Sequence, residues 1–387
     1  MLPCITAVAE NQPSKKHRMN HELSKFAARL RLAITSGFDP DQFAPLALEL
    51  FSRQYQKNVP YRKFCDRQGV RPAGLVDWTR IPAMPTTAFK WMELSCLPAT
   101  ERTAFFHSSG TTGQTAGCHF HGTESLPVYE ASLWQWFNAN WGKVEGMLVL
   151  TPGPAAAPHS SLVHMFETIR RRGGFPPTVY AGVVSPGGAW ELDFPAVLEM
   201  LRQGVRARKP VTLFGTAFSF VHLLDFLANL NLHFELPAGS RVLETGGYKN
   251  RSRQLPKAEL HALISRQLGI QPDQIVCEYG MSELSSQAYA TVRQSGFDGV
   301  PRPRGDGGAV DTAFQFPPWA RVRIISPENG EEVGDGETGL IRIFDLANVF
   351  SVAALQTEDL GIRRGGEFEL LGRAEMAEPR GCSLMTA

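Results

Sequence analysis

The sequence has no long uninterrupted apolar run and almost no net charge. None of its hydrophobic stretches approaches the roughly 20 residues that a membrane-spanning helix requires. The 39 lysine and arginine residues nearly balance the 38 aspartate and glutamate residues, which leaves a net charge of +1. Such a chain has no electrostatic preference for nucleic acid or for an anionic membrane surface. We therefore expect neither a membrane span nor a nucleic-acid partner.

Paired cysteines are also missing. The six cysteines form no Cys-x-x-Cys pair, and their spacing does not resemble a disulfide framework, so a reducing compartment is the simplest expectation. At the N-terminus the basic residues follow the short apolar start, which is the wrong order for a secretory signal. These features predict a cytoplasmic protein.

One local cluster, Cys118-His119-Phe120-His121, contains three residues that can bind a metal ion. The alternation also fits a strand with Cys118 and Phe120 on one face and the two histidines on the other. No second ligand pair lies near this cluster in the sequence, so we favour the strand over the metal site.

The pattern that is present is an alternation of apolar strands and helices. With 387 residues and 43% hydrophobic content, the chain can bury a large core. Strands that alternate with helices and end in polar loops predict an α/β sheet with a site at the strand ends. From about Trp319 the pattern changes to short strands separated by Asn-Gly, Asp-Gly and Gly-Gly turns, which predicts a small β subdomain.

We expect three parts: a helical region over 1–100 packed on the core, an α/β nucleotide- and acid-binding core over 101–318, and the small β subdomain with the C-terminal tail over 319–387. Residues 21–57 are expected to be helical, with a break between Gly37 and Pro40. In the core, helices are expected over 126–141, 162–172, 194–202, 218–230 and 257–268, and strands over 147–150, 179–183, 211–214, 241–245 and 275–279.

Residues 105–117 read FFHSSGTTGQTAG and combine hydroxyl groups with glycines. The stretch is not a Walker loop, because no Gly-Lys-Ser/Thr follows. Its glycines still let backbone amides approach an oxygen closely, and its serines and threonines add hydroxyl donors. The alternative is a polar turn between two strands. We favour phosphate contact by Ser108, Ser109, Gly110, Thr111, Thr112 and Gly113.

Further loops carry candidate ligands. In CEYGMSELSS, Tyr279 could stack on a flat base, Ser282 could meet a phosphate and Glu283 could meet Mg²⁺. Taken alone, Glu283 is better explained as an N-cap or first-turn acid of a following helix. In RVLETGGYKNR a glycine pair again follows a strand. In LQTEDLG, Asp359 precedes a turn and could bind ribose hydroxyls, and in LLGR, Arg373 follows a glycine.

The order of these loops resembles the adenylate-forming superfamily of acyl-, aryl- and luciferase-type ligases. SSGTTG, GG-Y after a strand, YGMSE, T-x-DLG, and LGR followed by PRG occur in the family's order over roughly residues 100–382. PHSSLVHMF, LETGGYKNR and the final RGCSLM are similar to the LuxE-type acyl-protein synthetases, the fatty-acid-activating subunits of a bacterial fatty acid reductase. The resemblance implies the layered sheets and helices of the N-terminal domain of an adenylate-forming enzyme.

Two features differ from the ordinary CoA ligases of this superfamily. Those enzymes continue past the LGR motif into a mobile C-terminal lid domain that carries a lysine, whereas this sequence ends at Ala387, shortly after Arg373. We therefore expect no lid domain, and Lys249 or Arg251 could replace the missing lysine. TED also stands in place of the commoner TGD. Both differences favour the LuxE type, which is similarly short.

The resemblance implies that the protein activates a carboxylic acid, by default an apolar fatty acid, as an acyl-adenylate with ATP and Mg²⁺. A thiol then captures the acyl group as a thioester, and Cys382 in RGCSLM is the implied carrier, although it could be an inert tail thiol. An acyl-accepting reductase or a carrier protein would be the partner. Two alternatives stay open: delivery to CoA or to a carrier-protein phosphopantetheine, and a non-catalytic binding subunit with this fold.

The same resemblance implies roles for individual residues. The loop over 108–113 would hold the β- and γ-phosphates, Glu283 would bind Mg²⁺, and Ser282 would lie near the α-phosphate. Asp359 and Arg373 would bind the ribose. The adenine slot would be formed by Gly246, Gly247, Tyr248, Tyr279 and Gly280. The acid pocket would be lined by His159, Ser160, Ser161, Gly215 and Thr216, although the serines after His159 could equally be the N-cap of the helix over 162–172.

Overall fold

The computed structural model describes residues 15–108, 116–142, 144–246, 255–290 and 313–374. Its α-helices are α1 (Lys15–Ser36), α2 (Phe43–Lys57), α3 (Val59–Arg67), α4 (Ser125–Trp141), α5 (Ser161–Gly173), α6 (Phe194–Ala207), α7 (Ala217–Asn229) and α8 (Lys257–Leu268). Within the described ranges, no helix is both long enough and apolar enough to cross a membrane.

The first two helices follow from apolar spacing and from one break. Phe26, Leu30 and Ile34 recur at helical intervals in α1 and are all buried. The helix ends where Gly37 adopts a φ of +108°, and Pro40 then begins a short 3-10 turn before α2. The predicted break between Gly37 and Pro40 is therefore confirmed.

A twelve-stranded sheet runs through the described part of the molecule. One half is parallel, and its strands are short and almost wholly buried, as expected for a sheet that is covered on both faces. In spatial order they are β10 (Ile275–Tyr279), β9 (Arg241–Thr245), β8 (Thr212–Thr216), β4 (Met147–Val149) and β5 (Thr178–Tyr180).

The other half of the sheet is mainly antiparallel and continues from β10 without a break. Its order is β11 (Ala288–Ala290), β12 (Ala313–Gln315), β16 (Glu367–Arg373), β15 (Ala354–Arg364), β14 (Thr338–Asp345) and β13 (Ala320–Ile325), and β1 (Met84–Pro85) pairs with β15. Two separate hairpins are formed by β2 (Ala104–His107) with β3 (Cys118–His121), and by β6 (Gly182–Val184) with β7 (Trp190–Leu192).

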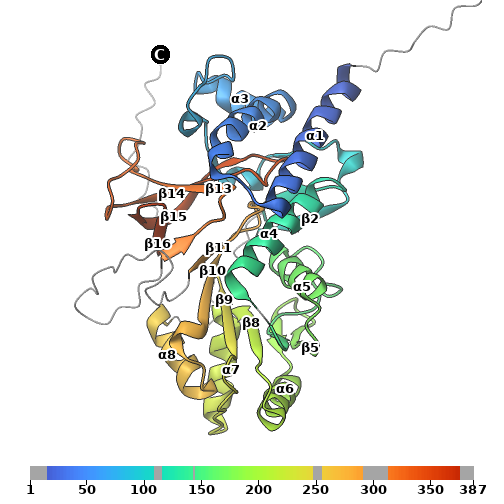
Figure 1. The fold of residues 1–387 in the computed structure, drawn as a ribbon, viewed down its shortest axis with the longest axis vertical. Coiled ribbons are helices and arrows are strands. Elements are labelled where there is room, and N and C mark those ends of the chain that lie inside the picture. The colour runs from blue at the N-terminus through green and yellow to red at the C-terminus, as the bar shows by residue number, and fades with distance from the viewer. Residues whose placement is uncertain (1–14, 109–115, 143, 247–254, 291–312, 375–387) are drawn as a thin grey trace, which may run out of the picture.

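Alternate residues of the parallel strands face different helices. Leu148 of β4 and Leu213 of β8 pack with α6, α7 and α8, whereas Val149 and Phe214 pack with α4 and α5. This arrangement gives a helix–sheet–helix sandwich. Figure 1 shows α6, α7 and α8 at the opposite end of the molecule from α1, α2 and α3.

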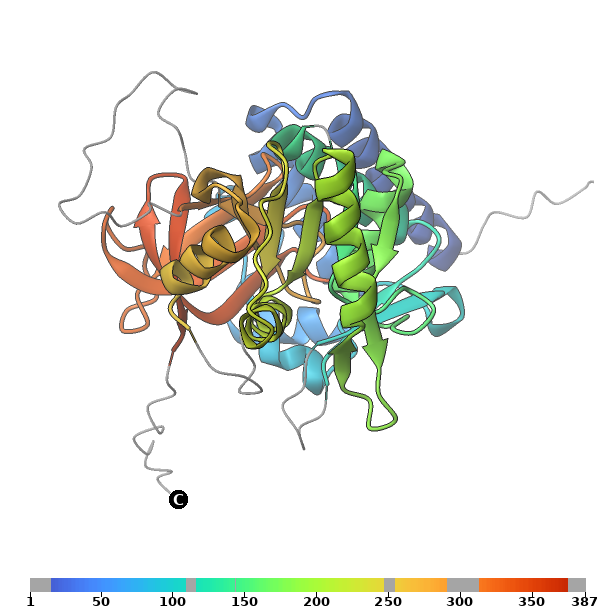
Figure 2. The same ribbon diagram turned by 90° about the horizontal axis from the view of Figure 1, so that it is seen from below.

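The N-terminal helices cover the antiparallel half. Phe26 of α1 and Phe51 of α2 belong to the same buried cluster as Ile341, Ile343 and Phe344 of β14. Figure 2 shows strands β13–β16, coloured orange to red, on the opposite side of the molecule from the green helices α5 and α6. The two halves therefore meet at β10 and β11, which is where the predicted site residues gather.

The predicted α/β class is confirmed, and two local predictions are wrong. The strand expected over 179–183 is split into β5 and β6, because the amides of Ala181 and Gly182 bond back to the carbonyl groups of Val149 and Thr151 and turn the chain away. The LQTEDLG stretch belongs to the long strand β15, so Asp359 lies within a strand and does not precede a turn.

Candidate active site

The base of the hydroxyl-rich loop is closed by reciprocal hydrogen bonds between Ser108 and Gly117. The Ser108 amide donates to the Gly117 carbonyl oxygen at 2.9 Å, and the Gly117 amide donates to Ser108 Oγ at 2.8 Å. A Cβ atom at Gly117 would lie 2.8 Å from Ser108 Oγ and 3.3 Å from Glu283 Oε1. Only glycine fits this approach, which brings the loop base against Glu283. Of the predicted phosphate ligands, Ser109, Gly110, Thr111, Thr112 and Gly113 lie outside the described residues.

The β3 strand that leaves this loop is confirmed. His119 and His121 are buried, whereas Cys118 and Phe120 are half-buried on the other face. Burial lowers the pKa of His119 to about 4, so the ring is neutral near pH 7. Its Nδ1 lies 2.8 Å from the carbonyl oxygen of Ser282. Because a carbonyl oxygen can only accept, Nδ1 carries the hydrogen, and the contact holds the loop after β10 against β3.

No helix follows β10, so the hypothesis that Glu283 caps one is wrong. The chain instead turns and enters β11. Buried Asp345 holds this turn by accepting from the Ser285 amide at 2.8 Å and from Ser286 Oγ at 2.7 Å. Asn348 adds a bond from its side-chain amide to the Glu283 carbonyl oxygen at 2.8 Å. Side chains from β14 and the following turn therefore fix the position of the loop after β10 by hydrogen bonds.

Glu283 is a buried carboxyl group, with 7% of the residue exposed. Burial raises its pKa, against the effects of Arg373, Lys90 and a hydrogen bond with Ser108. An added cation would stabilise the charged form of this carboxyl group, because that form is otherwise poorly solvated.

Lys90, at the end of the short turn over 86–90, was not among the predicted site residues. Nothing in the sequence links it to Glu283, which lies almost two hundred residues later.

Ser282 joins three segments. Its hydroxyl donates to the carbonyl oxygen of His107 at 2.8 Å, next to Ser108, and lies 3.2 Å from the hydroxyl of Ser161. The His107 amide in turn donates to the carbonyl oxygen of His159 at 3.0 Å. The predicted phosphate loop and the predicted acid-binding segment therefore both reach the loop after β10.

Tyr279, Asp359 and Arg373 form a second connected group. The Tyr279 hydroxyl donates to Asp359 Oδ2 at 2.8 Å, and Arg373 Nε lies 3.7 Å from Asp359 Oδ1. Asp359 and Arg373 are directly paired across β15 and β16. Burial raises the pKa of Asp359, whereas Tyr279 and Arg373 act to lower it. The pair predicted to bind ribose is thus brought together, and Arg373 also acts on Glu283.

The Tyr279 ring is only 6% exposed and lies edge-on to Phe314, Phe316 and Phe368. Its role as a stacking surface for adenine stays a prediction.

Gly246 has a φ of +69°, a conformation that favours glycine, directly after β9. Gly247 and Tyr248 lie outside the described residues, as do Lys249 and Arg251.

Gly280 lies close to the Glu278 carboxyl group, and a Cβ atom at position 280 would lie 2.3 Å from Glu278 Oε1, so a larger residue there would displace this side chain. The Thr245 hydroxyl donates to the Glu278 carboxyl group, which ties the ends of β9 and β10 together. Burial raises the pKa of Glu278 to about 7 from an ordinary 4.5.

This shift predicts a pH dependence of stability. The folded protein holds the Glu278 proton more tightly than the unfolded chain does, so this group makes the free energy of unfolding fall as pH rises from about 4.5 to 7. Glu278→Gln is expected to remove that contribution and to stabilise the protein at pH 8 by on the order of 2 kcal/mol. Chemical denaturation at pH 5 and pH 8 measures the free energy of unfolding of the wild type and of the variant. An equal effect of the substitution at both pH values would contradict the prediction.

The predicted acid-binding segment lies against β2. The exposed ring of His159 stacks on Phe105 with ring centres 4.0 Å apart. Ser160 is the N-cap of α5, and its Oγ accepts from the Val163 amide at 3.3 Å. The alternative that this segment caps a helix is therefore confirmed. Substrate contact by His159, Ser160 and Ser161 stays a prediction.

The capping role leads to an expected outcome for Ser160→Ala. Loss of the cap should lower the free energy of unfolding by about 1 kcal/mol. Thermal and denaturant unfolding measure this change. Ala157 lies in the preceding turn and takes part only through its backbone, accepting from the Ser160 amide and donating to the Gly153 carbonyl oxygen, so Ala157→Ser is the control. Unchanged stability of Ser160→Ala would contradict the capping role.

Gly215 and Thr216 have packing and capping contacts in the structure. A Cβ atom at Gly215 would lie 2.8 Å from Ser219 Oγ and 3.1 Å from Leu150 Cβ, so β8 and α7 can meet closely only with glycine there. Thr216 and Ser219 form a reciprocal capping box at the start of α7. Contact of Gly215 and Thr216 with an acid stays a prediction.

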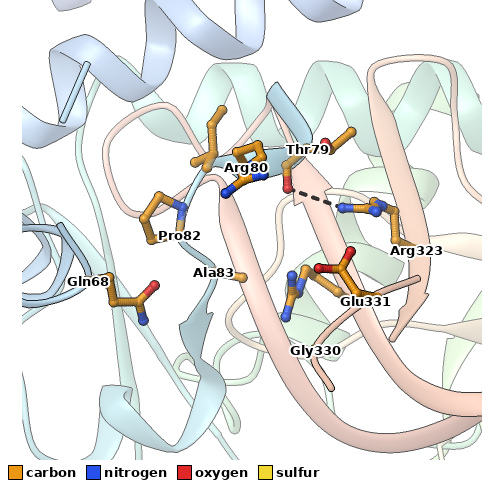
Figure 3. A pocket seen from close by; sticks show the side chains of 10 residues that line it. Gln68, Thr79, Arg80, Pro82, Ala83, Arg323, Gly330 and Glu331 are labelled. Carbon is orange, nitrogen blue, oxygen red and sulfur yellow. Dashed lines mark hydrogen bonds between the residues drawn. The ribbon is translucent and has the colours of Figure 1, made fainter. Parts of the chain in front are cut away.

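A polar hollow of about 240 Å³ lies elsewhere, between the segment over 68–83 and strands β13 and β14. Figure 3 shows Arg323 donating to the Thr79 carbonyl oxygen across this hollow. Arg323 also pairs with Glu332 at 3.0 Å, so its charge is compensated within the protein. None of the residues that line this hollow is a predicted site residue.

Comparison with known proteins decides the family. The family model described as "Acyl-protein synthetase, LuxE" matches residues 174–387, which is more than half of the chain. The chain belongs to the LuxE family. The resemblance to LuxE-type acyl-protein synthetases is thereby confirmed, and so is the prediction that the protein is a ligase.

Two curated relatives of this LuxE-family chain are both named long-chain-fatty-acid–luciferin-component ligase. The protein from Vibrio harveyi is 23% identical over 345 residues, which cover 86% of this chain and 84% of the relative. The protein from Aliivibrio fischeri is 23% identical over 361 residues, which cover 88% of this chain and 87% of the relative.

A solved ligase structure shares the fold, which confirms the predicted adenylate-forming type of layered fold. 2-Hydroxyisobutyryl-CoA ligase, in complex with 2-HIB-AMP and CoA, gives a TM-score of 0.60 at 13% identity, with 94% of the LuxE-family chain and 72% of the ligase covered. ATP-bound MatB from Rhodopseudomonas palustris gives a TM-score of 0.45 at 18% identity over 78% of this chain, which spans about half (51%) of MatB.

Proposed function

We propose that this LuxE-family protein uses ATP to activate a fatty acid as an acyl-adenylate and then transfers the acyl group to its own Cys382. Family membership and the names of the two curated relatives, both long-chain-fatty-acid ligases, support the fatty acid. The single observation that carries the chemistry is that three segments far apart in the sequence meet at the end of β10. His107, next to Ser108, accepts from Ser282, and Asp359, paired with Arg373, accepts from Tyr279.

In the first step a carboxylate oxygen attacks the α-phosphorus of ATP. The bond from this phosphorus to the oxygen that leads to the β-phosphate breaks, and pyrophosphate leaves. Because two anions approach each other, the site must lower their repulsion. Arg373 and Lys90, which both act on Glu283, supply positive charge from this chain, and the loop over 108–113 would add amide and hydroxyl donors.

Glu283 fits a role in holding Mg²⁺. It is a buried carboxyl group whose charged form is disfavoured by burial, and the Ser108 hydroxyl lies beside it. Mg²⁺ is commonly held by one or two carboxylates together with substrate phosphates. When bound there it would neutralise charge on the phosphates. Ser282 lies one residue away and would contact the α-phosphate.

In the second step the thiolate of Cys382 attacks the acyl carbon. The bond from this carbon to the phosphate oxygen breaks, AMP leaves, and a thioester forms on the protein. An acyl-accepting reductase or a carrier protein would then receive the acyl group. Cys382 lies outside the described residues, so its role depends on the RGCSLM match and on family membership.

Exchange of labelled pyrophosphate into ATP tests the first step without involving any thiol. We expect exchange only when a carboxylic acid is present, with long-chain fatty acids preferred over aromatic acids. Screening acids of different length would identify the substrate. If no acid supported exchange, the protein would be a non-catalytic subunit and the proposal would be wrong.

A further inference from the structure

Glu244, His261 and Cys277 form a buried cluster near the carboxyl ends of β9 and β10. Glu244 on β9 and Cys277 on β10 are direct partners across the parallel ladder, and His261 comes from α8, which covers this face of the sheet (Figure 1). All three residues are at most 9% exposed. None of them is used in the proposed reaction.

The three ligand atoms lie close together. Cys277 Sγ is 3.3 Å from Glu244 Oε2 and 3.6 Å from His261 Nε2, and His261 Nε2 is 3.5 Å from Glu244 Oε2. In a tetrahedral zinc site with bonds of about 2.0–2.3 Å, neighbouring ligand atoms are separated by about 3.3–3.6 Å. The observed triangle therefore matches one face of such a tetrahedron without any movement of the chain.

The charges also suit a divalent cation. A thiolate and a carboxylate together carry two negative charges, and a neutral imidazole carries none, so one Zn²⁺ balances the charge of these three ligands. Thiolate, imidazole and carboxylate are the ligand types that zinc takes in proteins. Without a metal, burial first and the nearby Glu244 second raise the pKa of the Cys277 thiol. Binding would release the thiol proton as the Zn–S bond forms.

Lys257 lies on the more open side of the cluster. Its Nζ is 4.0 Å from Glu244 Oε2, and its side chain is 38% exposed. Although burial acts to raise it, the pKa of Glu244 is lowered, because His261 and Lys257 favour the carboxylate. Lys257 Nζ also lies 5.0 Å from the centre of the Phe314 ring, which keeps its ammonium group beside the cluster. The three side chains supply three ligands, and a water molecule would complete the tetrahedron.

We propose that Glu244, His261 and Cys277 bind one Zn²⁺ ion, separate from the Mg²⁺ proposed at Glu283. The ion would join β9, β10 and α8 just below Gly246 and Tyr279. It would hold the two strand ends that carry the predicted adenine slot in a constant relative position. The proposal is independent of the acid substrate and of Cys382.

Metal content and cobalt spectroscopy on the full-length protein test this site. Protein produced in zinc-containing medium is expected to hold one zinc per chain by elemental analysis. After removal of zinc by a chelator, Co²⁺ should give a thiolate-to-cobalt charge-transfer band and the d–d bands of a tetrahedral ion. Neither readout requires enzymatic activity or a variant.

Substitutions then assign the ligands. Cys277→Ser should lose the charge-transfer band and most of the bound zinc, and His261→Gln should lower zinc affinity at least tenfold. Cys65→Ser, which removes a buried thiol from α3, should keep both signals and is the matched control. If wild-type protein held no zinc and Co²⁺ gave no thiolate band, the proposal would be wrong. Retention of the band by Cys277→Ser would also overturn it, whether or not that variant were less stable.

Discussion

Glu283→Gln is expected to lower acid-dependent pyrophosphate exchange about 100-fold, the size of effect typical for loss of one group that stabilises developing charge. Glutamine keeps the size of the side chain but binds Mg²⁺ poorly and carries no charge. Burial already disfavours the charged form of Glu283, so the substitution should not lower the melting temperature. Exchange rates measured against Mg²⁺ concentration would show whether excess metal restores part of the activity.

Glu278→Gln is the matched control for this experiment. Glu278 and Glu283 are each 7% exposed, but Glu278 accepts from Thr245 between two strands and is not part of the connected site. Its substitution should leave exchange nearly unchanged. If Glu283→Gln kept the wild-type exchange rate, Glu283 would not hold the metal. Equal losses in both variants would show that a buried carboxyl group near β10 matters for folding only.

Cys382→Ser is expected to abolish the covalent acyl adduct while leaving pyrophosphate exchange intact. The adduct is a thioester in the proposed second step, whereas exchange reports only the first step. Incubation with ATP, Mg²⁺ and a labelled fatty acid, followed by intact-protein mass spectrometry, measures the adduct. Sensitivity of the label to neutral hydroxylamine would identify it as a thioester.

Cys118→Ser is the suitable control because Cys118 is a half-buried thiol on β3, on the face away from the buried histidines. This variant should acquire the label like the wild type. If Cys382→Ser still acquired the thioester, another cysteine would be the carrier. If neither the wild type nor the variant were labelled but exchange continued, CoA or a carrier-protein phosphopantetheine would be the acceptor to test next.

The parallel half of the fold could be predicted because its strands are unambiguous. The runs at 241–245 and 275–279 each contain consecutive apolar residues, are followed by glycine-containing loops, and form β9 and β10 at the predicted bounds. Strand β15 could not be predicted in the same way. It contains polar residues such as Asp359 and resembles a turn, and it is a strand because β14 and β16 pair with both of its edges.

The site could be predicted only in part, for a related reason. The motif residues Glu283 and Asp359 were found from their positions after or near strands, but the contacts that define their environment are long-range. Lys90 and the supporting Asp345 have no local signal, because each acts through a side chain that reaches another segment. The same holds for the Glu244–His261–Cys277 cluster, whose members are dispersed over two strands and a helix.

Strand β16 ends at Arg373, in the candidate site. The last described residue, Ala374, follows Arg373 and donates its amide to the Glu358 carbonyl oxygen at 2.9 Å. Seven residues lie between Ala374 and Cys382, and the eight Cα–Cα steps of a fully extended chain span at most about 28 Å. The thiol is therefore tethered within this radius of the β15–β16 edge. If Cys382 carries the acyl group as proposed, the active site of a reductase or carrier protein that collects it would have to come within the same radius, so the length of this segment would limit where such a partner binds.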